Sequence, residues 1–268
     1  MNTMNIPLIL PQKIARLIGD KPYTADQTGL SGAKVMLFDD SVLRITPADP
    51  RNEQTVHVMQ WLQGRLPAPR VIAFEQEADH QYLLMSRVTG TMACDDAYLS
   101  RPKVLIPLLA EAMQMLWHTD PDGCPRTRGM DTELAEAADR VERGLVDMEN
   151  AGPETFGKGG FRDPEALLRW LIDNRPEEEP VLSHGDFCLP NLLLENDRIS
   201  GFIDLDTFGI GDRWRDIADC CGSLQRNAQG AYGGKVYPDC KAELLFSALG
   251  IRPDADRMRW YQLLDTLF

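Results

Sequence analysis

Residues 182–209, LSHGDFCLPNLLLENDRISGFIDLDTFG, combine polar loops with short apolar runs. The runs NLLL and ISGFIDL have the pattern of strands, and the ENDR between them has the composition of a turn. Two short strands of this kind would hold Asn191 and Asp204 at adjacent ends, next to the loop that carries Asp186. We therefore expect these three polar side chains to converge on one point.

An Asp, an Asn and a second Asp without a His or Cys form an oxygen donor set of the kind that Mg²⁺ prefers. Phosphoryl transfer from a nucleotide uses such a set, because the metal neutralises the phosphate oxygens while a separate Asp orients the attacking hydroxyl. The alternative is structural, since Asp and Asn are common turn residues that bind backbone amides. For the ordered set with its flanking strands, the pattern favours a phosphotransfer site.

The composition is that of a folded cytoplasmic protein. The chain has 268 residues, of which 43% are hydrophobic, which is enough for one large domain or two modest ones. No apolar run approaches the roughly 20 residues that cross a bilayer. The first residues, MNTMNIPLILPQKIARLIG, lack the features of a signal peptide. We expect no membrane association.

The charge balance bears on the kind of partner. With 41 acidic and 28 basic residues, the formal net charge is -13, which argues against nucleic acid and favours a cationic partner. The six cysteines show no C-x-x-C spacing, so the sequence predicts neither a zinc site nor a disulfide framework.

Two regions of different structure follow from the periodicity. Residues 33–45 and 70–86 each predict a pair of strands, and residues 52–64 between them predict a helix. After Gly90 longer amphipathic segments predict helices, at residues 104–119, 131–150, 163–174, 215–227, 240–250 and 253–268. The chain is thus predicted to be α+β, with a small β-rich lobe over residues 1–88 and a larger, mostly helical lobe over residues 89–268.

The segment HGDFCLPN followed by GFIDLD resembles the H-G-D-x-x-x-x-N and I-D signatures of the aminoglycoside phosphotransferase family. GLSGAKV, WLQGRLPAPRVIAFE, YLLMSRVTG, GDRWRDIADC and WYQLLDTLF resemble further family elements in the same order. They are most similar to the 3'-phosphotransferase branch. The resemblance implies a bilobal fold like that of protein kinases, with residues 1–88 binding the nucleotide and residues 89–268 holding the catalytic and substrate sites.

The same resemblance implies roles for residues of the opening stretch. Asp186 would act as the base or orienting residue for the acceptor hydroxyl, and Asn191 and Asp204 would bind Mg²⁺. His184 is implied as a structural organiser of the loop. Two later carboxylates, Asp212 and Asp216, are expected to hydrogen-bond loop backbones.

For the nucleotide, ATP or GTP, the resemblance implies four positions in the first lobe. Ser31 would lie over the phosphates, and the hinge residues Ser86 and Val88 would offer backbone groups to the base. Arg44 stands where the family has a phosphate-gripping lysine, and a planar guanidinium is not equivalent to an ammonium.

Two further positions depart from the family. Thr55 stands where the family has the glutamate that holds the lysine. Arg44 would then act without that partner, or Glu53 would replace it through a shifted helix, or nucleotide handling would be impaired. Asp206 is an extra carboxylate near Asp204, which would either strengthen metal binding or repel phosphates.

On the acceptor side, the resemblance implies that Glu149, Asp265 and the terminal Phe268 bind the ammonium groups of a cationic aminoglycoside. Arg226 and Thr266 fall where the 3' enzymes carry glutamates. Their loss should weaken the binding of a polycation, since each exposed ion pair contributes up to roughly 1 kcal/mol.

Three functions remain open on this sequence. The first is a kinase that phosphorylates an aminoglycoside, at the 3'-hydroxyl, and so confers resistance. The second is a kinase for another hydroxylated metabolite. The third is a weakly active, pseudokinase-like protein that binds a nucleotide.

Overall fold

The computed structural model describes residues 10–26, 33–149, 151 and 153–268, so the predicted phosphate-loop residue Ser31 lies outside the described residues. The chain forms two compact units, residues 1–88 and 89–268. Within the described ranges, no helix combines the length and the apolar character needed to cross a lipid bilayer.

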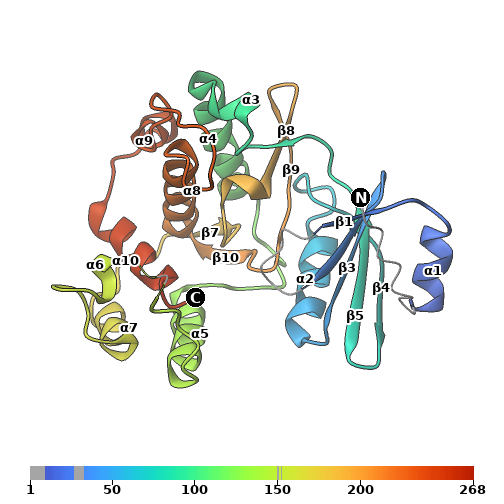
Figure 1. The fold of residues 1–268 in the computed structure, drawn as a ribbon, viewed down its shortest axis with the longest axis horizontal. Coiled ribbons are helices and arrows are strands. Elements are labelled where there is room, and N and C mark those ends of the chain that lie inside the picture. Colours follow the sequence, from blue (N-terminus) through green and yellow to red (C-terminus); the bar gives the residue numbers. More distant parts are fainter. Residues whose placement is uncertain (1–9, 27–32, 150, 152) are drawn as a thin grey trace. The chain divides into compact units, whose positions relative to one another are not determined.

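The first unit is an antiparallel sheet with two helices, and its strands follow the order β1-β2-β3-β5-β4 (Figure 1). The hairpin predicted from residues 33–45 is present as β2 and β3, closed by a bond from Phe38 N to Ser41 O of 2.9 Å. The elements are α1 (Gln12–Ile18), β1 (Thr24–Asp26), β2 (Lys34–Leu37), β3 (Ser41–Pro47), α2 (Pro50–Trp61), β4 (Val71–Glu77) and β5 (His80–Ser86).

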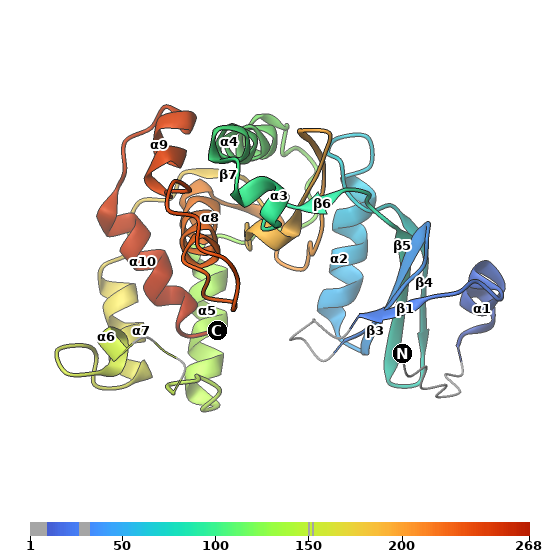
Figure 2. The same cartoon turned by 45° about the horizontal axis from the view of Figure 1, so that its top comes forward.

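The helices α1 and α2 lie on opposite faces of this sheet (Figure 2). Side chains alternate between the faces along β3, so Leu43 and Ile45 point the same way and pack in a core cluster with Ile14 of α1. Arg44 lies between them and therefore faces the other side, where its Nη2 reaches Asn52 of α2. The alternation thus brings a cation to the α2 face.

The second unit is mostly helical and contains two small antiparallel sheets, β7 with β10, and β6 with β8 and β9 (Figure 1). Its elements are β6 (Thr91–Met92), α3 (Asp96–Leu99), α4 (Pro102–His118), α5 (Met130–Glu142), α6 (Pro153–Phe156), α7 (Pro164–Asp173), β7 (Pro180–Ser183), the 3-10 helix η1 (Leu189–Asn191), β8 (Leu192–Glu195), β9 (Arg198–Phe202), β10 (Gly209–Asp212), α8 (Arg213–Ala228), α9 (Glu243–Leu249) and α10 (Ala255–Asp265).

Helix α4 forms the centre of this unit. Its residues Leu105, Leu109, Ala112, Met113 and Leu116 recur every three or four positions and are fully buried. Burial of each Leu side chain contributes roughly 1.5–3 kcal/mol. The helix packs against α9 and against β7, so the core fixes the strand that leads into the residues of the opening stretch.

The helix predicted over residues 131–150 is shorter than expected. α5 ends at Glu142, and Gly144 follows with φ of 64°, a conformation that ends helices and that glycine adopts readily. The prediction of a continuous helix to residue 150 was therefore wrong, and the available signal was Gly144 itself. Consequently Asp147 and Glu149 lie in the segment after α5 rather than on a helix.

Candidate active site

The loop that carries Asp186 follows β7 and is held by a carboxylate of α8. Asp216 accepts hydrogen bonds from Ser183 Oγ (2.9 Å), His184 N (3.1 Å) and Gly185 N (3.0 Å). Because Asp216 is fully buried on a helix of the core, these bonds fix the start of the loop relative to α8.

Gly185 lets this loop pass very close to the chain beyond β9. Its φ is 74°, and a Cβ atom built there would lie 2.6 Å from the backbone oxygen of Thr207. Thr207 Oγ1 also donates to His184 O at 3.1 Å. Thr207 thus ties the two segments together.

We expect Gly185→Ala to destabilise the protein more than Gly144→Ala. Gly144 has a similar φ of 64° but no atom within 4 Å of its Cβ position. Gly144→Ala should therefore lower the free energy of unfolding only by the cost of placing Ala at a positive φ, about 1 kcal/mol. Gly185→Ala should cost a further 1–3 kcal/mol or so, because Thr207 must move, and should also lower turnover. Urea unfolding and initial rates of both variants check this, and equal effects would contradict it.

The buried carboxylate of Asp216 should make stability depend on pH. Burial raises its pKa to about 7 from 3.8, although the three hydrogen bonds oppose the shift. A raised folded-state pKa contributes stability below about pH 4 that is lost as the pH rises through 7.

We therefore expect the unfolding free energy of the wild type, relative to Asp216→Asn, to fall by roughly 2 kcal/mol between pH 5.5 and pH 7. Urea unfolding at several pH values measures this difference. A difference that rises with pH would show that Asp216 stays ionised in the folded protein.

Asp186 and Asn191 form a hydrogen-bonded pair. Asn191 Nδ2 donates to Asp186 Oδ2 at 2.9 Å and to Asp186 O at 3.0 Å. Both residues are half-buried. Since the amide nitrogen faces Asp186, the amide oxygen of Asn191 is the atom left to act as a ligand, and the Asp186 carboxylate is oriented.

Ile203, the residue before Asp204, connects it to the segment that carries Asp186 and Asn191. Ile203 N donates to Asn191 O at 2.9 Å, and Ile203 O accepts from His184 Nε2 at 2.9 Å. Asp204 itself is exposed and has φ of 58°, a strained conformation that clusters at functional sites. An exposed carboxylate and an oriented amide oxygen suit a hard cation that takes its remaining ligands from water and phosphate.

A larger metal cluster is not found: no group of three or more His, Cys, Asp and Glu suited to a metal occurs in the part of the chain that the structure describes.

His184 supports this arrangement and is unsuited to acid–base chemistry. Its ring is fully buried and contacts Phe187, Phe202 and Phe208, and burial lowers its pKa. The neutral imidazole donates from Nε2 to Ile203 O, and the organising role of His184 stays a prediction.

Asp212 likewise binds backbone groups and a phenol. It accepts from Glu179 N (3.1 Å), Trp214 N (3.3 Å) and Tyr261 Oη (2.8 Å). Its carboxylate caps the N-terminus of α8 and, through the hydrogen bond from Tyr261, links that helix to α10. This is the loop-supporting contact expected of it.

Arg126 is an organiser that we did not predict from the sequence. It is 3% exposed, and its Nη1 donates to the carbonyl oxygens of Leu205 (3.1 Å), Asp206 (2.7 Å) and Phe208 (3.2 Å). Burial lowers the pKa of Arg126, and the Asp206 carboxylate acts in the opposite direction. The charge of the extra carboxylate is therefore offset in part by a buried cation.

In the first unit, an amide contacts Arg44. Arg44 Nη2 lies 3.4 Å from Asn52 Oδ1, whereas Glu53 is exposed. Thr55, at the position of the family's glutamate, is buried and donates to Arg51 O at 3.1 Å. The nucleotide-binding role of Arg44 stays a prediction.

The hinge residues are also located. Ser86 N donates to Arg70 O, and its hydroxyl accepts from Arg70 N, both at 2.8 Å. Val88 is half-buried. The N–H of Ser86 is therefore engaged within the first unit, and the nucleotide-binding roles of both residues stay predictions.

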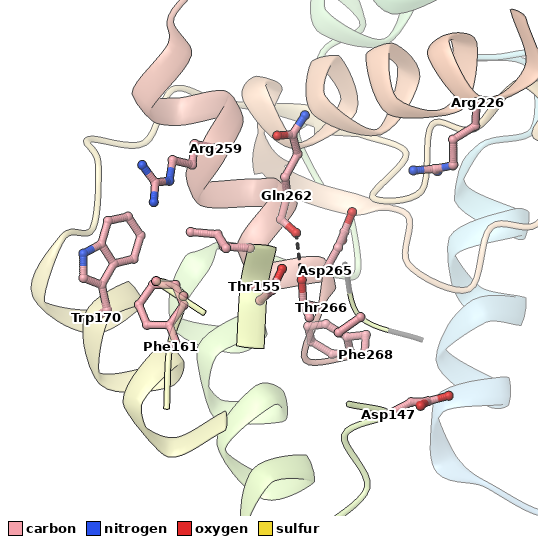
Figure 3. Close-up of a pocket in the computed structure, with 14 residues that line it drawn as sticks. Asp147, Thr155, Phe161, Trp170, Arg226, Arg259, Gln262, Asp265, Thr266 and Phe268 are labelled. Atoms are coloured by element: carbon pink, nitrogen blue, oxygen red, sulfur yellow. Dashed lines mark hydrogen bonds between the residues drawn. The ribbon is translucent and has the colours of Figure 1, made fainter. Parts of the chain in front are cut away.

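A cavity of about 1050 Å³ lies in the second unit, lined by the segment after α5, the α6–α7 region, α8 and α10 (Figure 3). This volume is of the order found for small-molecule sites. The charged residues among the described lining are Asp147, Arg226, Arg259 and Asp265.

The structure brings only some of the predicted acceptor residues to this cavity. Asp265 and Phe268 line it, whereas Glu149 is not among its described lining residues. Asp147, two positions earlier, lines the cavity instead, and it accepts from Glu149 N at 3.1 Å. The early end of α5 explains this difference, because the segment after it does not follow helical geometry.

Arginines already contact the two predicted groups that do line the cavity. Arg215 Nη1 lies 2.5 Å from Asp265 Oδ1, and Arg140 Nη2 donates to Phe268 O at 2.5 Å. Arg215 also reaches the loop that carries Asp186, where its Nε donates to Gly185 O at 3.3 Å. The sequence offered no signal for these contacts beyond the presence of Arg on helices.

Residues 26–261 match the sequence model of the phosphotransferase enzyme family. The chain belongs to this family. The phosphotransferase is 35% identical over 269 residues to an aminoglycoside 3'-phosphotransferase of Enterococcus faecalis, with 96% of this chain and 97% of the relative covered. It is 34% identical to one of Staphylococcus aureus, with the same coverage.

Solved structures of the family share the fold. The aminoglycoside phosphotransferase APH(3'')-Id from Streptomyces rimosus matches with a TM-score of 0.78 at 27% identity, over 96% of this chain and 99% of that one. An aminoglycoside-3'-phosphotransferase of type VIII matches with a TM-score of 0.76 at 25% identity, over 95% and 97%. The predicted α+β, protein-kinase-like fold and the predicted family are confirmed.

Proposed function

We propose that this phosphotransferase moves the γ-phosphoryl group of ATP or GTP to the 3'-hydroxyl of an aminoglycoside and so confers resistance. The observation that carries this proposal is the Asp186–Asn191 pair, held by α8 in the same unit as an acceptor-sized cavity. Relatives that are named aminoglycoside 3'-phosphotransferases, at up to 35% identity over nearly their whole length, support the acceptor class. A related structure holds ADP and streptomycin, which supports a nucleotide donor.

In the proposed reaction, Asp186 accepts a hydrogen bond from the acceptor hydroxyl and takes its proton. The hydroxyl oxygen forms a bond to the γ-phosphorus while the bond to the β–γ bridging oxygen breaks, so the nucleoside diphosphate leaves. Asn191 keeps the Asp186 carboxylate in one orientation. The amide oxygen of Asn191 and the carboxylate of Asp204 would hold Mg²⁺, which neutralises charge on the phosphates.

We assign the nucleotide to residues 1–88 and the catalytic and acceptor sites to residues 89–268. Arg44, on the α2 face of the sheet, would bind phosphate oxygens, and the hinge around Ser86 and Val88 would contact the base. The protein would act in the cytoplasm, where nucleoside triphosphates are available. Asp265, Phe268 and Asp147 would face the acceptor.

The test compares kanamycin B with tobramycin, its 3'-deoxy relative, in a coupled assay with ATP or GTP and Mg²⁺. We expect turnover of kanamycin B, none of tobramycin, and none of either after Mg²⁺ is chelated. Equal turnover of the two would contradict the 3' position. If neither these nor other aminoglycosides react while the protein still hydrolyses or binds the nucleotide, the acceptor class is wrong and a panel of hydroxylated metabolites replaces it.

A further inference from the structure

The charged lining of the acceptor cavity is not uniformly acidic. Among the described lining residues, Asp147 and Asp265 carry negative charge, and Arg226 and Arg259 carry positive charge. A site for a molecule with many ammonium groups would be expected to present mainly carboxylates. The cavity of this chain instead presents both signs.

The negative charge of Asp265 is also offset by an arginine outside the cavity lining. Its carboxylate is 44% exposed and is paired with Arg215, whose side chain is 13% exposed. The cationic side chain of Arg226 also interacts with Asp265. An incoming ammonium group therefore meets a carboxylate whose charge Arg215 already offsets in part.

Arg226 is held in place by two neighbours. Its Nε donates to the hydroxyl of Tyr232 at 3.1 Å, from the segment between α8 and α9. Its Nη1 folds back over Gly222, so close that a Cβ atom there would lie 3.2 Å away. Figure 3 shows the side chain reaching from α8 into the cavity.

Arg226 lies on α8, the helix that also holds the loop of Asp186 through Asp216. The pKa of Cys188 is raised by burial and by Asp186, and Arg226 acts in the opposite direction. The charge of Arg226 therefore acts on a residue of the same loop as Asp186.

Arg259 differs from Arg226 in its surroundings. Its guanidinium carbon lies 5.8 Å from the ring centre of Trp170, which itself packs edge-on against Phe161. The face of the indole stabilises this cation. In Figure 3 Arg259 and Trp170 lie at the opposite side of the cavity from Arg226.

We propose that Arg226 determines acceptor specificity, by selecting a hydroxyl-bearing ring without an ammonium group at the end of the cavity that α8 forms. The substrate class is then an aminoglycoside whose ammonium groups lie toward Asp147, with hydroxyls toward Arg226. This inference rests on the proposed aminoglycoside kinase activity and narrows its acceptor. The guanidinium donates to hydroxyl oxygens and repels an ammonium group, and Tyr232 positions it.

The test uses two pairs of acceptors, paromomycin with neomycin and kanamycin A with kanamycin B. The members of each pair differ at one position, a hydroxyl in the first and an ammonium in the second. Turnover gives kcat/KM for each acceptor, and calorimetry gives the binding constant whether or not the acceptor turns over. The measured quantity is the ratio between the two members of a pair.

For the wild type we expect a ratio of about 5 in favour of the hydroxyl member in at least one pair, as one exposed charge interaction provides. Arg226→Gln should bring that ratio to about 1, and Arg226→Glu should reverse it, a total change of roughly 20-fold. Arg226→Lys should keep the wild-type preference. Tyr232→Phe, which removes only the hydroxyl, should give an intermediate ratio.

The matched control is Arg252→Glu, an equal charge change at an exposed residue outside the described cavity lining. Its ratios should equal those of the wild type. If Arg226→Glu and Arg252→Glu leave the same ratios in both pairs, by turnover and by binding, the role of Arg226 is refuted while aminoglycoside kinase activity stands. If all four acceptors neither turn over nor bind to the wild type, the proposed function fails, and this inference with it.

Discussion

Asp186→Asn is expected to lower kcat/KM for the acceptor by about 10³-fold, as loss of a general base does in other enzymes. The oxygen of the new amide can still accept the hydrogen bond from Asn191 Nδ2, so the loop geometry should survive. What is lost is a carboxylate that takes the proton of the attacking hydroxyl. Initial rates in the coupled assay give the fall in turnover. Calorimetry should show a nucleotide binding constant within about twofold of wild type, because Asn and Asp side chains have nearly the same size.

The matched control is Asp173→Asn, which neutralises an exposed carboxylate at the end of α7. It should leave kcat/KM unchanged. A residual rate of Asp186→Asn within tenfold of the control would mean that Asp186 only orients the hydroxyl and that proton transfer does not limit turnover.

Arg215→Met is expected to reduce the unfolding free energy by about 3–5 kcal/mol, the usual cost of leaving buried carboxylates without their cation. The Arg215 guanidinium lies between Asp219, with Nε 3.1 Å from Oδ2, and Glu133 at 3.8 Å. The side chains of these carboxylates are 3% and 6% exposed. Methionine fills the volume but leaves both negative charges buried.

The loss should depend on pH in a definite direction. Burial raises the pKa of both Asp219 and Glu133, so without the arginine they will take up protons in the folded state. The difference between wild type and Arg215→Met should therefore be smaller at pH 5 than at pH 8, as measured by urea unfolding. Adding Asp219→Asn to the variant should restore part of the stability.

Arg143→Ala provides the control for an ion pair on the surface. Arg143 pairs with Asp139 one turn away on α5, with both side chains more than half exposed. Its loss should cost at most about 1 kcal/mol. Equal losses for the two arginines would show that the interior around Arg215 is hydrated and that its carboxylates are not buried charges.

Much of the fold was predictable because it depends on local patterns. The strands β2 and β3 followed from apolar runs around an Asp-Asp-Ser turn, and α4 followed from a repeat of three or four residues. The end of α5 was missed because good helix-forming residues continue beyond it, although Gly144 was present as a stop signal. Local preference is a weak guide where it conflicts with a cap.

The residues of the candidate site were also predictable only in part. Asp186 and Asn191 were found because they are five positions apart on one loop, and the structure joins them directly. Arg126 and Arg215 were missed because each acts on backbone oxygens far away in the sequence, at Asp206 and at Gly185. No spacing rule predicts which arginine will fold inward, since that depends on packing.

The amino-acid sequence by itself determined the family and the α+β fold, and it predicted the pair of Asp186 and Asn191, because these two residues lie five positions apart on one loop. Only the tertiary structure decided the charge of the acceptor cavity. Asp147, Arg226 and Asp265 come from separate segments, and a guanidinium that already faces a carboxylate weakens its attraction for a further cation. Coulomb interactions depend on distance in space, and folding alone brought Arg215 to Asp265 and Arg226 into the cavity.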